Sequence, residues 1–197
     1  GGAQEKTVRG ISHIPQMALV SLEGPGMVGI PGISQKFFSV LSQAQINVVL
    51  ITQASSEHSI TIAIASADAQ KAVDVVNEAF SYEIKQGMIN ALVPELDMAI
   101  LALVGDQMRS HQGLSGKMFQ TLGRNNVNIR VIAQGSSERN ISAVIAEKDV
   151  PKAINALHET FFEAQTKQVN LFVMGVGTVG SQLLEQLEKQ SDYLQNH

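Results

Sequence analysis

Apolar residues along the chain fall into two series of short runs that have the same order. In the first series, residues 17–22 are apolar as in a strand, and residues 33–44 carry apolar side chains at helical spacing. Residues 48–52 are a second strand-like run, and residues 60–64 alternate large with small side chains, which predicts a strand with two unlike faces. Residues 69–80 return to helical spacing.

The second series restarts at Met98 and copies the first without a gap. The offset from Met17 to Met98 is 98 − 17 = 81, and the same offset separates Gln53 from Gln134. A constant offset over a whole series of elements indicates an internal duplication. Each repeat therefore predicts the order strand, helix, strand, strand, helix.

This order predicts an α+β fold with two ferredoxin-like (βαββαβ) domains. Residues 91–93 are a weak candidate for the last strand of the first repeat, whereas no such run follows Phe162 in the second. Residues 7–14 can form a spare short strand that Pro15 closes. We expect this strand to complete the second sheet, so that the first domain is inserted in the second. The expected boundaries are 1–16 for linker and strand, 17–93 for the first domain, 94–165 for the second and 166–197 for a further segment.

A glutamine stands at the same strand end in both repeats. Gln53 and Gln134 close apolar β-branched runs, and each is followed in the turn by Ser-Ser-Glu. An amide offers two donors and an acceptor, which suits a small zwitterionic ligand. The alternative is a solvent-facing strand end. Asn47 and Asn128 favour a turn between helix and strand, with a ligand contact as the alternative.

Glycine-rich loops precede the first helix of each repeat. Residues 24–32 and 105–113 lead into helices whose exposed N–H groups can bind a carboxylate. The loops lack the Gly-Lys-Ser/Thr of a phosphate-binding loop. The chain has no cysteine and its five histidines show no metal-ligand spacing, so the sequence predicts no metal site and no catalytic residue.

Composition narrows the class of partner. The net charge is −4 and no basic stripe is visible, which argues against nucleic acid. The apolar runs are too short to span a bilayer, so we expect no membrane contact and a cytoplasmic location. Only 16% of the residues are charged. A thinly charged surface and open sheet edges predict a homodimer or higher homo-oligomer through the sheets.

The segment after residue 165 has a different character. Residues 169–174 are an apolar run followed by G-x-G-x-x-G and a helical pattern, which is the context of a dinucleotide-binding fingerprint. Its glycines, Gly175, Gly177 and Gly180, are the candidate cofactor-binding residues. We expect the truncated start of a Rossmann domain here. Because one strand and one helix cannot bury a core, we expect no cofactor to bind this segment alone.

The motifs together resemble a known family. Gly-Pro-Gly-Met, Val-Val-Leu-Ile-Thr-Gln-Ala-Ser-Ser-Glu and Ile-Ala-Gln-Gly-Ser-Ser-Glu resemble the paired ACT domains of aspartokinases. Val-Asn-Leu-Phe-Val-Met-Gly-Val-Gly-Thr-Val-Gly is similar to the start of a homoserine dehydrogenase NAD(P)-binding domain. The combination resembles the central regulatory region of bifunctional aspartokinase–homoserine dehydrogenases. The resemblance implies a feedback-regulatory region that is not itself an enzyme, within a parent that uses ATP with magnesium and NADP.

The resemblance also implies an effector and its contacts. The threonine-inhibited branch is most similar because both glutamines are present, whereas lysine-sensitive relatives tend to carry an acid where Val49 stands. The implied partner is thus a small amino acid, threonine. The implied contacts in the first repeat are Met27, Ile30, Ile33, Asn47, Val48, Val49 and Gln53. Those in the second repeat are Met108, His111, Leu114, Asn128, Ile129, Arg130 and Gln134.

Three other functions fit parts of the sequence. The first is an ACT module of a monofunctional aspartokinase, or of a dehydrogenase that responds to another amino acid. The second is a nucleotide-dependent dehydrogenase in which the ACT pair is accessory. The third is an RNA-binding ferredoxin-like module, against which the acidic charge and the lack of strand aromatics count.

Overall fold

The computed structural model describes residues 8–54, 59–106, 113–134 and 139–163, all of which belong to one compact unit of the chain. The strands are β1 (Val8–Glu23), β2 (Val48–Ala54), β3 (Ser59–Ala65), β4 (Glu95–Gly105), β5 (Ile129–Gln134) and β6 (Asn140–Ala146). The α-helices are α1 (Ile33–Gln43), α2 (Ala69–Ala79), α3 (Ser81–Lys85), α4 (Leu114–Arg124) and α5 (Val150–His158). Short 3-10 turns occur at Pro25–Val28, Ser66–Asp68 and Glu147–Asp149, and a π-helical turn at Glu159–Glu163.

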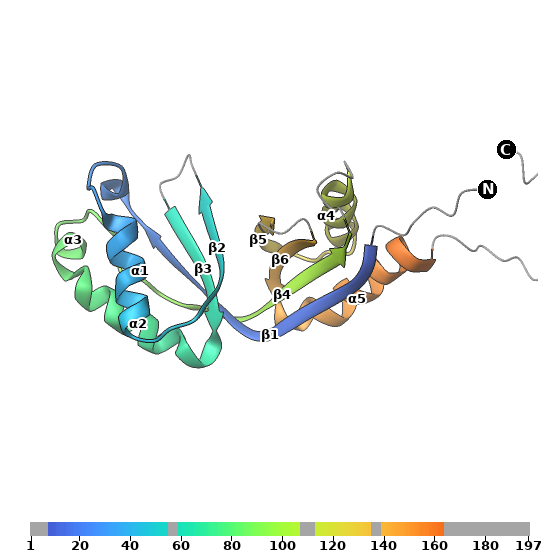
Figure 1. The fold of residues 1–197 in the computed structure, drawn as a ribbon, viewed down its shortest axis with the longest axis horizontal. Helices are drawn as coiled ribbons and strands as arrows, with labels where there is room; N and C mark the ends of the chain where they lie inside the picture. The colour runs from blue at the N-terminus through green and yellow to red at the C-terminus, as the bar shows by residue number, and fades with distance from the viewer. Residues whose placement is uncertain (1–7, 55–58, 107–112, 135–138, 164–197) are drawn as a thin grey trace, which may run out of the picture. The chain divides into compact units, whose positions relative to one another are not determined.

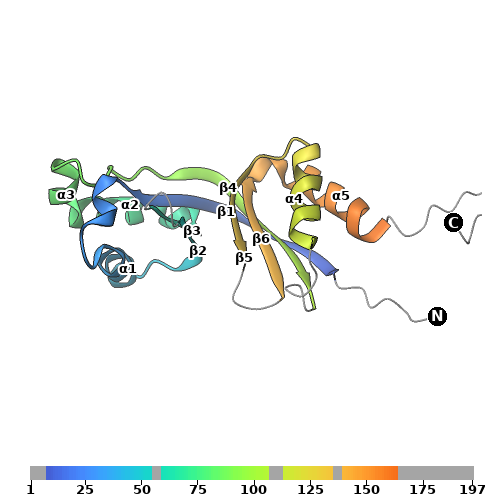
Figure 2. The same cartoon turned by 90° about the horizontal axis from the view of Figure 1, so that it is seen from above.

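The strands form one six-stranded antiparallel sheet in the order β2-β3-β1-β4-β6-β5. The elements of each repeat follow the predicted order, and the α+β ferredoxin-like class is confirmed. The sheet is continuous because β1 and β4 run side by side through both repeats (Figures 1 and 2). The second half of β1 pairs with β3, from Met17 opposite Ala65 to Glu23 opposite Ser59.

The first half of β1 supplies a strand to the sheet of the second repeat. Val8 lies opposite Gly105 and Ile14 lies opposite Ile100 on β4. The prediction that Pro15 ends a separate short strand is wrong, since β1 continues through it to Glu23. A register shift between Ile14 and Met17 accommodates the proline, and Gln16 there has a left-handed φ of 55°. A β-bulge of this kind tolerates a residue without an N–H donor.

The predicted strand at residues 91–93 is absent, and β4 begins at Glu95. The segment before β4 is instead fixed by a side chain of α2. The amide of Asn77 donates to the carbonyl of Leu92 over 3.1 Å and accepts from its N–H over 2.8 Å. These bonds satisfy the backbone that a ladder would otherwise pair.

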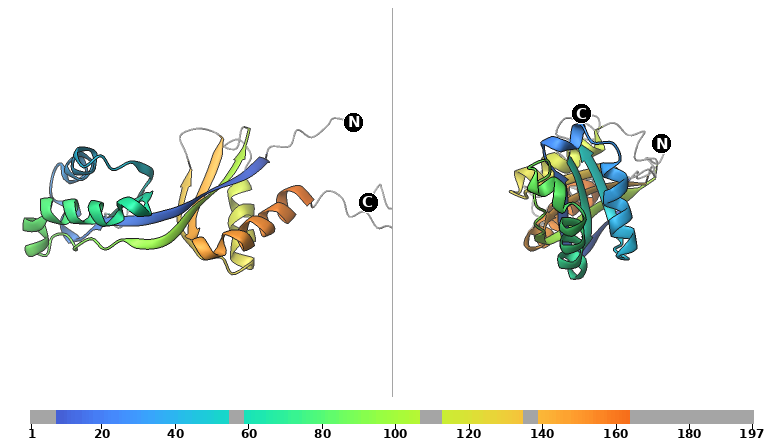
Figure 3. Two further views of the ribbon diagram at one scale, coloured as in Figure 1. Left: turned by 90° about the horizontal axis from the view of Figure 1, so that it is seen from below. Right: turned by 90° about the vertical axis from the view of Figure 1, so that its left-hand side faces the viewer.

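Each repeat has its own core between helices and sheet. In the first, α1 and α2 pack over β1 and β3, with Phe37, Leu41 and Phe80 almost fully buried. In the second, α4 and α5 cover the other half of the sheet, with Met118 and Leu122 in its core (Figure 3). The predicted helical faces are confirmed, because the residues at the expected spacing are the buried ones.

The second helix of each repeat begins at an aspartate that does not cap it. Asp68 and Asp149 stand at the N-cap positions of α2 and α5, but neither side chain makes a capping hydrogen bond. Each aspartate has helical backbone angles because a 3-10 turn runs directly into the helix, and capping normally needs an extended N-cap residue.

The sequence predicted the turn after the first helix of each repeat at Asn47 and Asn128. The helices end earlier than this, at Gln43 and Arg124. The turn lies at Gln45 and Asn126, each with a left-handed φ of 57°. The following residues, Ile46 and Val127, donate to carbonyls five residues back, which is a Schellman motif.

A third apolar cluster lies on the face of the sheet opposite the helices. Side chains of β1, β3, β4 and β6 meet there, with Leu50 of β2 and Val131 of β5 packed against them. The cluster contains Met17, Leu19, Ala63, Met98, Ile100 and Val144. Since each repeat contributes half of these residues, the two halves of the sheet share this helix-free face.

Candidate functional site

The loop before α1 is held in place by close backbone contact. The N–H of Gly26 donates to the carbonyl of Met88 over 2.8 Å. A Cβ on Gly24 would stand 2.4 Å from that same oxygen, and one on Gly26 would meet Met88 at 2.6 Å. Glycine is therefore required at both positions, and the loop approaches α1 along a fixed path.

The starts of α1 and α4 have the same construction. Gly32 and Gly113 occupy their N-cap positions with left-handed φ values of 80° and 95°. Neither helix has a side-chain cap from this residue, nor an acidic residue in its first turn. The positive end of each helix dipole is thus not neutralised by its own first turn, and it can accept a carboxylate.

Four predicted contacts of the first repeat lie together against its core. Ile33 is buried in it, and Met27, Ile30 and Val48 are partly buried against it. Asn47 and Val49 are exposed. Because the Ile33 side chain is part of the core, a ligand would meet this residue through its backbone N–H.

The predicted contacts of the second repeat are divided between two places. Leu114 and Ile129 pack on the core of that repeat, and Asn128 is exposed. Arg130 forms an ion pair with Glu95 at the start of β4, on the helix-free face. This pairing was not predicted, because no sequence signal links residues 95 and 130. Met108 and His111 lie outside the described residues.

The two glutamines are placed by their backbones. Gln53 lies opposite Ile60 in the β2–β3 pair, and Gln134 lies opposite Ile141 in the β5–β6 pair. Their side chains, and the glycines Gly175, Gly177 and Gly180, are outside what the structure describes. Their roles stay predictions.

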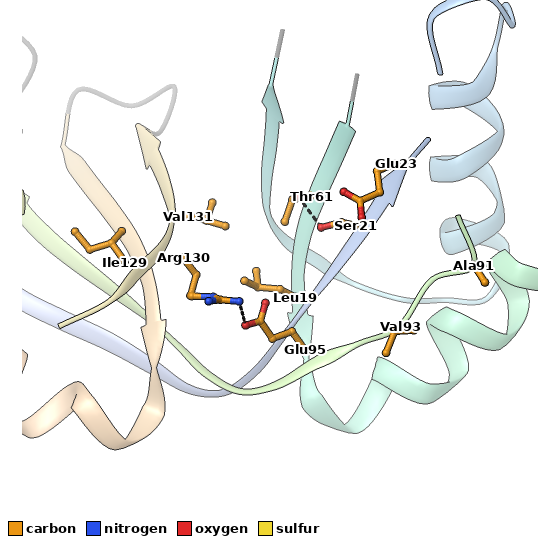
Figure 4. Close-up of a pocket in the computed structure, with 10 residues that line it drawn as sticks. All are labelled: Leu19, Ser21, Glu23, Thr61, Ala91, Val93, Glu95, Ile129, Arg130 and Val131. Carbon is orange, nitrogen blue, oxygen red and sulfur yellow. Dashed lines mark hydrogen bonds and ion pairs between the residues drawn. The ribbon is translucent and has the colours of Figure 1, made fainter. Parts of the chain in front are cut away.

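A groove of about 440 Å³ opens on the helix-free face. Its floor is Leu19 and Ser21 of β1, with Glu23 at one end and the Arg130–Glu95 pair at the other (Figure 4). Ser21 and Thr61 share a hydrogen bond of 2.8 Å between their hydroxyl groups. Residues of both repeats line this groove, so a molecule bound in it would contact both.

No group of three or more His, Asp or Glu side chains that could hold a metal ion occurs in the part of the chain that the structure describes. No helix in the described ranges is long and apolar enough to cross a bilayer. The candidate sites are the two helix starts, the strand ends and the groove.

Comparison with known proteins identifies the repeats. The family model described as ACT domain matches residues 20–80 and 101–161. The bifunctional aspartokinase/homoserine dehydrogenase of Haemophilus influenzae is 38% identical over 187 residues, which cover 95% of this chain and 23% of that protein. The chloroplastic bifunctional enzyme of Daucus carota is 34% identical over 193 residues, covering 98% of this chain and 21% of that protein. The chain thus spans between a fifth and a quarter of the length of these relatives.

Two solved structures share the fold. The ligand-free regulatory subunit of aspartate kinase from Thermus thermophilus is 27% identical with a TM-score of 0.66, and the match covers 79% of this chain and 99% of that one. Aspartate kinase from Synechocystis is 26% identical with a TM-score of 0.69, covering 87% of this chain and 29% of that one. The chain therefore belongs to the ACT domain family, as a regulatory ACT pair of the aspartokinase/homoserine dehydrogenase type.

Proposed function

We propose that this ACT pair is the allosteric region through which L-threonine controls a bifunctional aspartokinase–homoserine dehydrogenase. The observation that carries the proposal is the repeated helix start. Gly32 and Gly113 each begin a helix without a side-chain cap or a first-turn acid. Each helix leads through its turn to a strand that carries Gln53 or Gln134 in its last two residues.

The chemistry of threonine matches the groups at these positions. Its carboxylate would accept from N–H groups of the loop and the first helical turn. Its ammonium would donate to strand carbonyls, and the glutamine amide would supply the remaining hydrogen bonds. Met27 and Ile30 are partly buried at the edge of the core, which suits contact with the threonine methyl group.

Regulation would follow from a difference in affinity between two arrangements of the parent enzyme. Threonine can favour one arrangement only by as much as it binds that arrangement more tightly. The kinase and dehydrogenase activities, with ATP, magnesium and NADP, belong to regions of the parent other than this pair. The fingerprint at Gly175, Gly177 and Gly180 favours the bifunctional parent over a monofunctional aspartokinase.

Calorimetric titration of the chain with single amino acids tests the proposal. We expect saturable binding of threonine, and weaker binding of lysine and methionine at the same sites. If lysine or methionine binds more tightly than threonine at the sites that contain Gln53 and Gln134, that amino acid and not threonine is the effector. If threonine, lysine and methionine all give no heat of binding, the allosteric assignment is wrong.

A further inference from the structure

The charged residues of the groove on the helix-free face differ in chemistry from the residues at the equivalent positions of the other repeat. The offset of 81 relates Glu95 to Ile14 and Arg130 to Val49. It likewise relates Glu23 to Val104, and Ser21 to Ala102. Every charged group of the groove is thus an aliphatic side chain at its equivalent position. The duplicated fold by itself does not require charges here, because the equivalent positions carry none.

The charges of the groove lie at its two ends. Leu19 is opposite Glu95 across the β1–β4 pair, so the Arg130–Glu95 ion pair marks the Leu19 end. Glu23 stands four residues further along β1, on the same face as Leu19 and Ser21 because side chains alternate along a strand. Among the described residues Glu23 has no ion-pair partner. The groove therefore has the Arg130–Glu95 ion pair at one end and a carboxylate without an ion-pair partner among the described residues at the other.

Apolar side chains and two hydroxyl groups line the stretch between the ends. Leu19, Val131 and Val93 line it, and the hydroxyl groups of Ser21 and Thr61 are already bonded to each other. Four residues of strand span about 13 Å. Because both charged side chains reach inwards, a ligand that joins them is shorter than this, roughly the length of five or six linked carbons.

We propose that this groove binds a small ω-amino carboxylate, with its carboxylate on Arg130 and its ammonium on Glu23. The methylene chain lies along Leu19 and Val131. This site is separate from the helix starts proposed for threonine. Since residues of both repeats line the groove, its ligand joins the first repeat to the second.

Calorimetry with 6-aminohexanoate tests the site, with hexanoate and hexylamine as ligands that have one charged end. We expect 6-aminohexanoate to bind at least threefold more tightly than either, because an exposed ion pair contributes up to about 1 kcal/mol. Binding should weaken as salt is added. No saturable heat with 6-aminohexanoate, or equal affinity for all three molecules, would overturn the proposal.

Single substitutions assign the two ends. Arg130→Gln should weaken 6-aminohexanoate and hexanoate threefold or more and spare hexylamine. Glu23→Gln should weaken 6-aminohexanoate and hexylamine and spare hexanoate. Arg124→Gln and Glu78→Gln make the same charge changes at exposed positions on α4 and α2, and they should leave all three affinities unchanged. Equal losses in these control variants would show a general charge effect and overturn the site.

The double variant Arg130→Val and Glu95→Ile copies the equivalent pair of the first repeat. It should abolish the preference for 6-aminohexanoate over hexylamine. Threonine binding, measured separately, should be unchanged in Glu23→Gln, which changes no residue of the proposed threonine sites. If the unmodified chain binds 6-aminohexanoate but not threonine, the proposed effector is wrong. If it binds threonine but not 6-aminohexanoate, the groove proposal is wrong.

Discussion

Met17 of β1 lies opposite Met98 of β4, and these two residues are the same position of the repeat. The neighbouring pairs, Ile14 opposite Ile100 and Leu19 opposite Glu95, also exchange under the offset of 81. The two repeats are therefore related by a local twofold axis between the methionines. The third apolar cluster surrounds this axis, since Leu19 with Ile100, and Leu50 with Val131, are further equivalent pairs within it.

The threonine sites can be separated by two single substitutions. Gln53→Ala should weaken the first site and leave the second largely intact, and Gln134→Ala should do the reverse. A hydrogen bond to a charged ligand contributes roughly 1.5–3 kcal/mol, so each affinity should fall roughly ten- to a hundredfold. Calorimetry on the two variants measures this. Unchanged threonine affinity in both would remove the glutamines from the site.

The Schellman turns predict a stabilising substitution. Gln45 has a left-handed φ of 57°, which costs an L-residue roughly 1–2 kcal/mol. Gln45→Gly should raise the free energy of unfolding by about 0.5–1 kcal/mol after the entropy of glycine is counted. Asn126→Gly should gain less, because asparagine tolerates this conformation better. Urea unfolding checks both. Ser39→Gly, at an exposed position inside α1, is the control and should destabilise.

The equivalent core residues Phe37 and Met118 have no exposed surface. Phe37→Ala should lower the free energy of unfolding by about 3–5 kcal/mol, and Met118→Ala by about 2–5 kcal/mol. Tyr82→Ala, at a side chain that is 66% exposed, should change it by less than about 0.5 kcal/mol. Denaturant titration of the three variants measures these differences. A loss below about 1 kcal/mol for Phe37→Ala would contradict the packing of α1.

The edges of the sheet predict association. β2 and β5 are the outer strands, and they expose Ile51 by 54% and Ile132 by 46%. We expect a homodimer by light scattering, because open edges with apolar side chains pair with another copy. Ile51→Lys or Ile132→Lys should shift the molecule toward monomer, whereas Tyr82→Lys should not. A monomeric wild-type chain at high concentration, with and without threonine, would contradict this assembly.

The sequence by itself determined the duplication, the order of helices and strands within each repeat, and most of the core. These features are local, since helical spacing at Phe37 and Leu41 and alternation at Ile60, Ile62 and Ile64 are written in neighbouring residues. The glycine-rich loop and the glutamine at the strand end could also be read from the repeat.

The tertiary structure decided what depends on distant residues. Pro15 reads as a strand end, but pairing with two different partners carries β1 through it. Residues 91–93 read as a strand, but the amide of Asn77 fixes the backbone there instead. The ion pair of Arg130 with Glu95 could not be read from the sequence, because the two residues are far apart in the chain. Each outcome depends on contacts between residues far apart in the chain, which a local sequence pattern does not show.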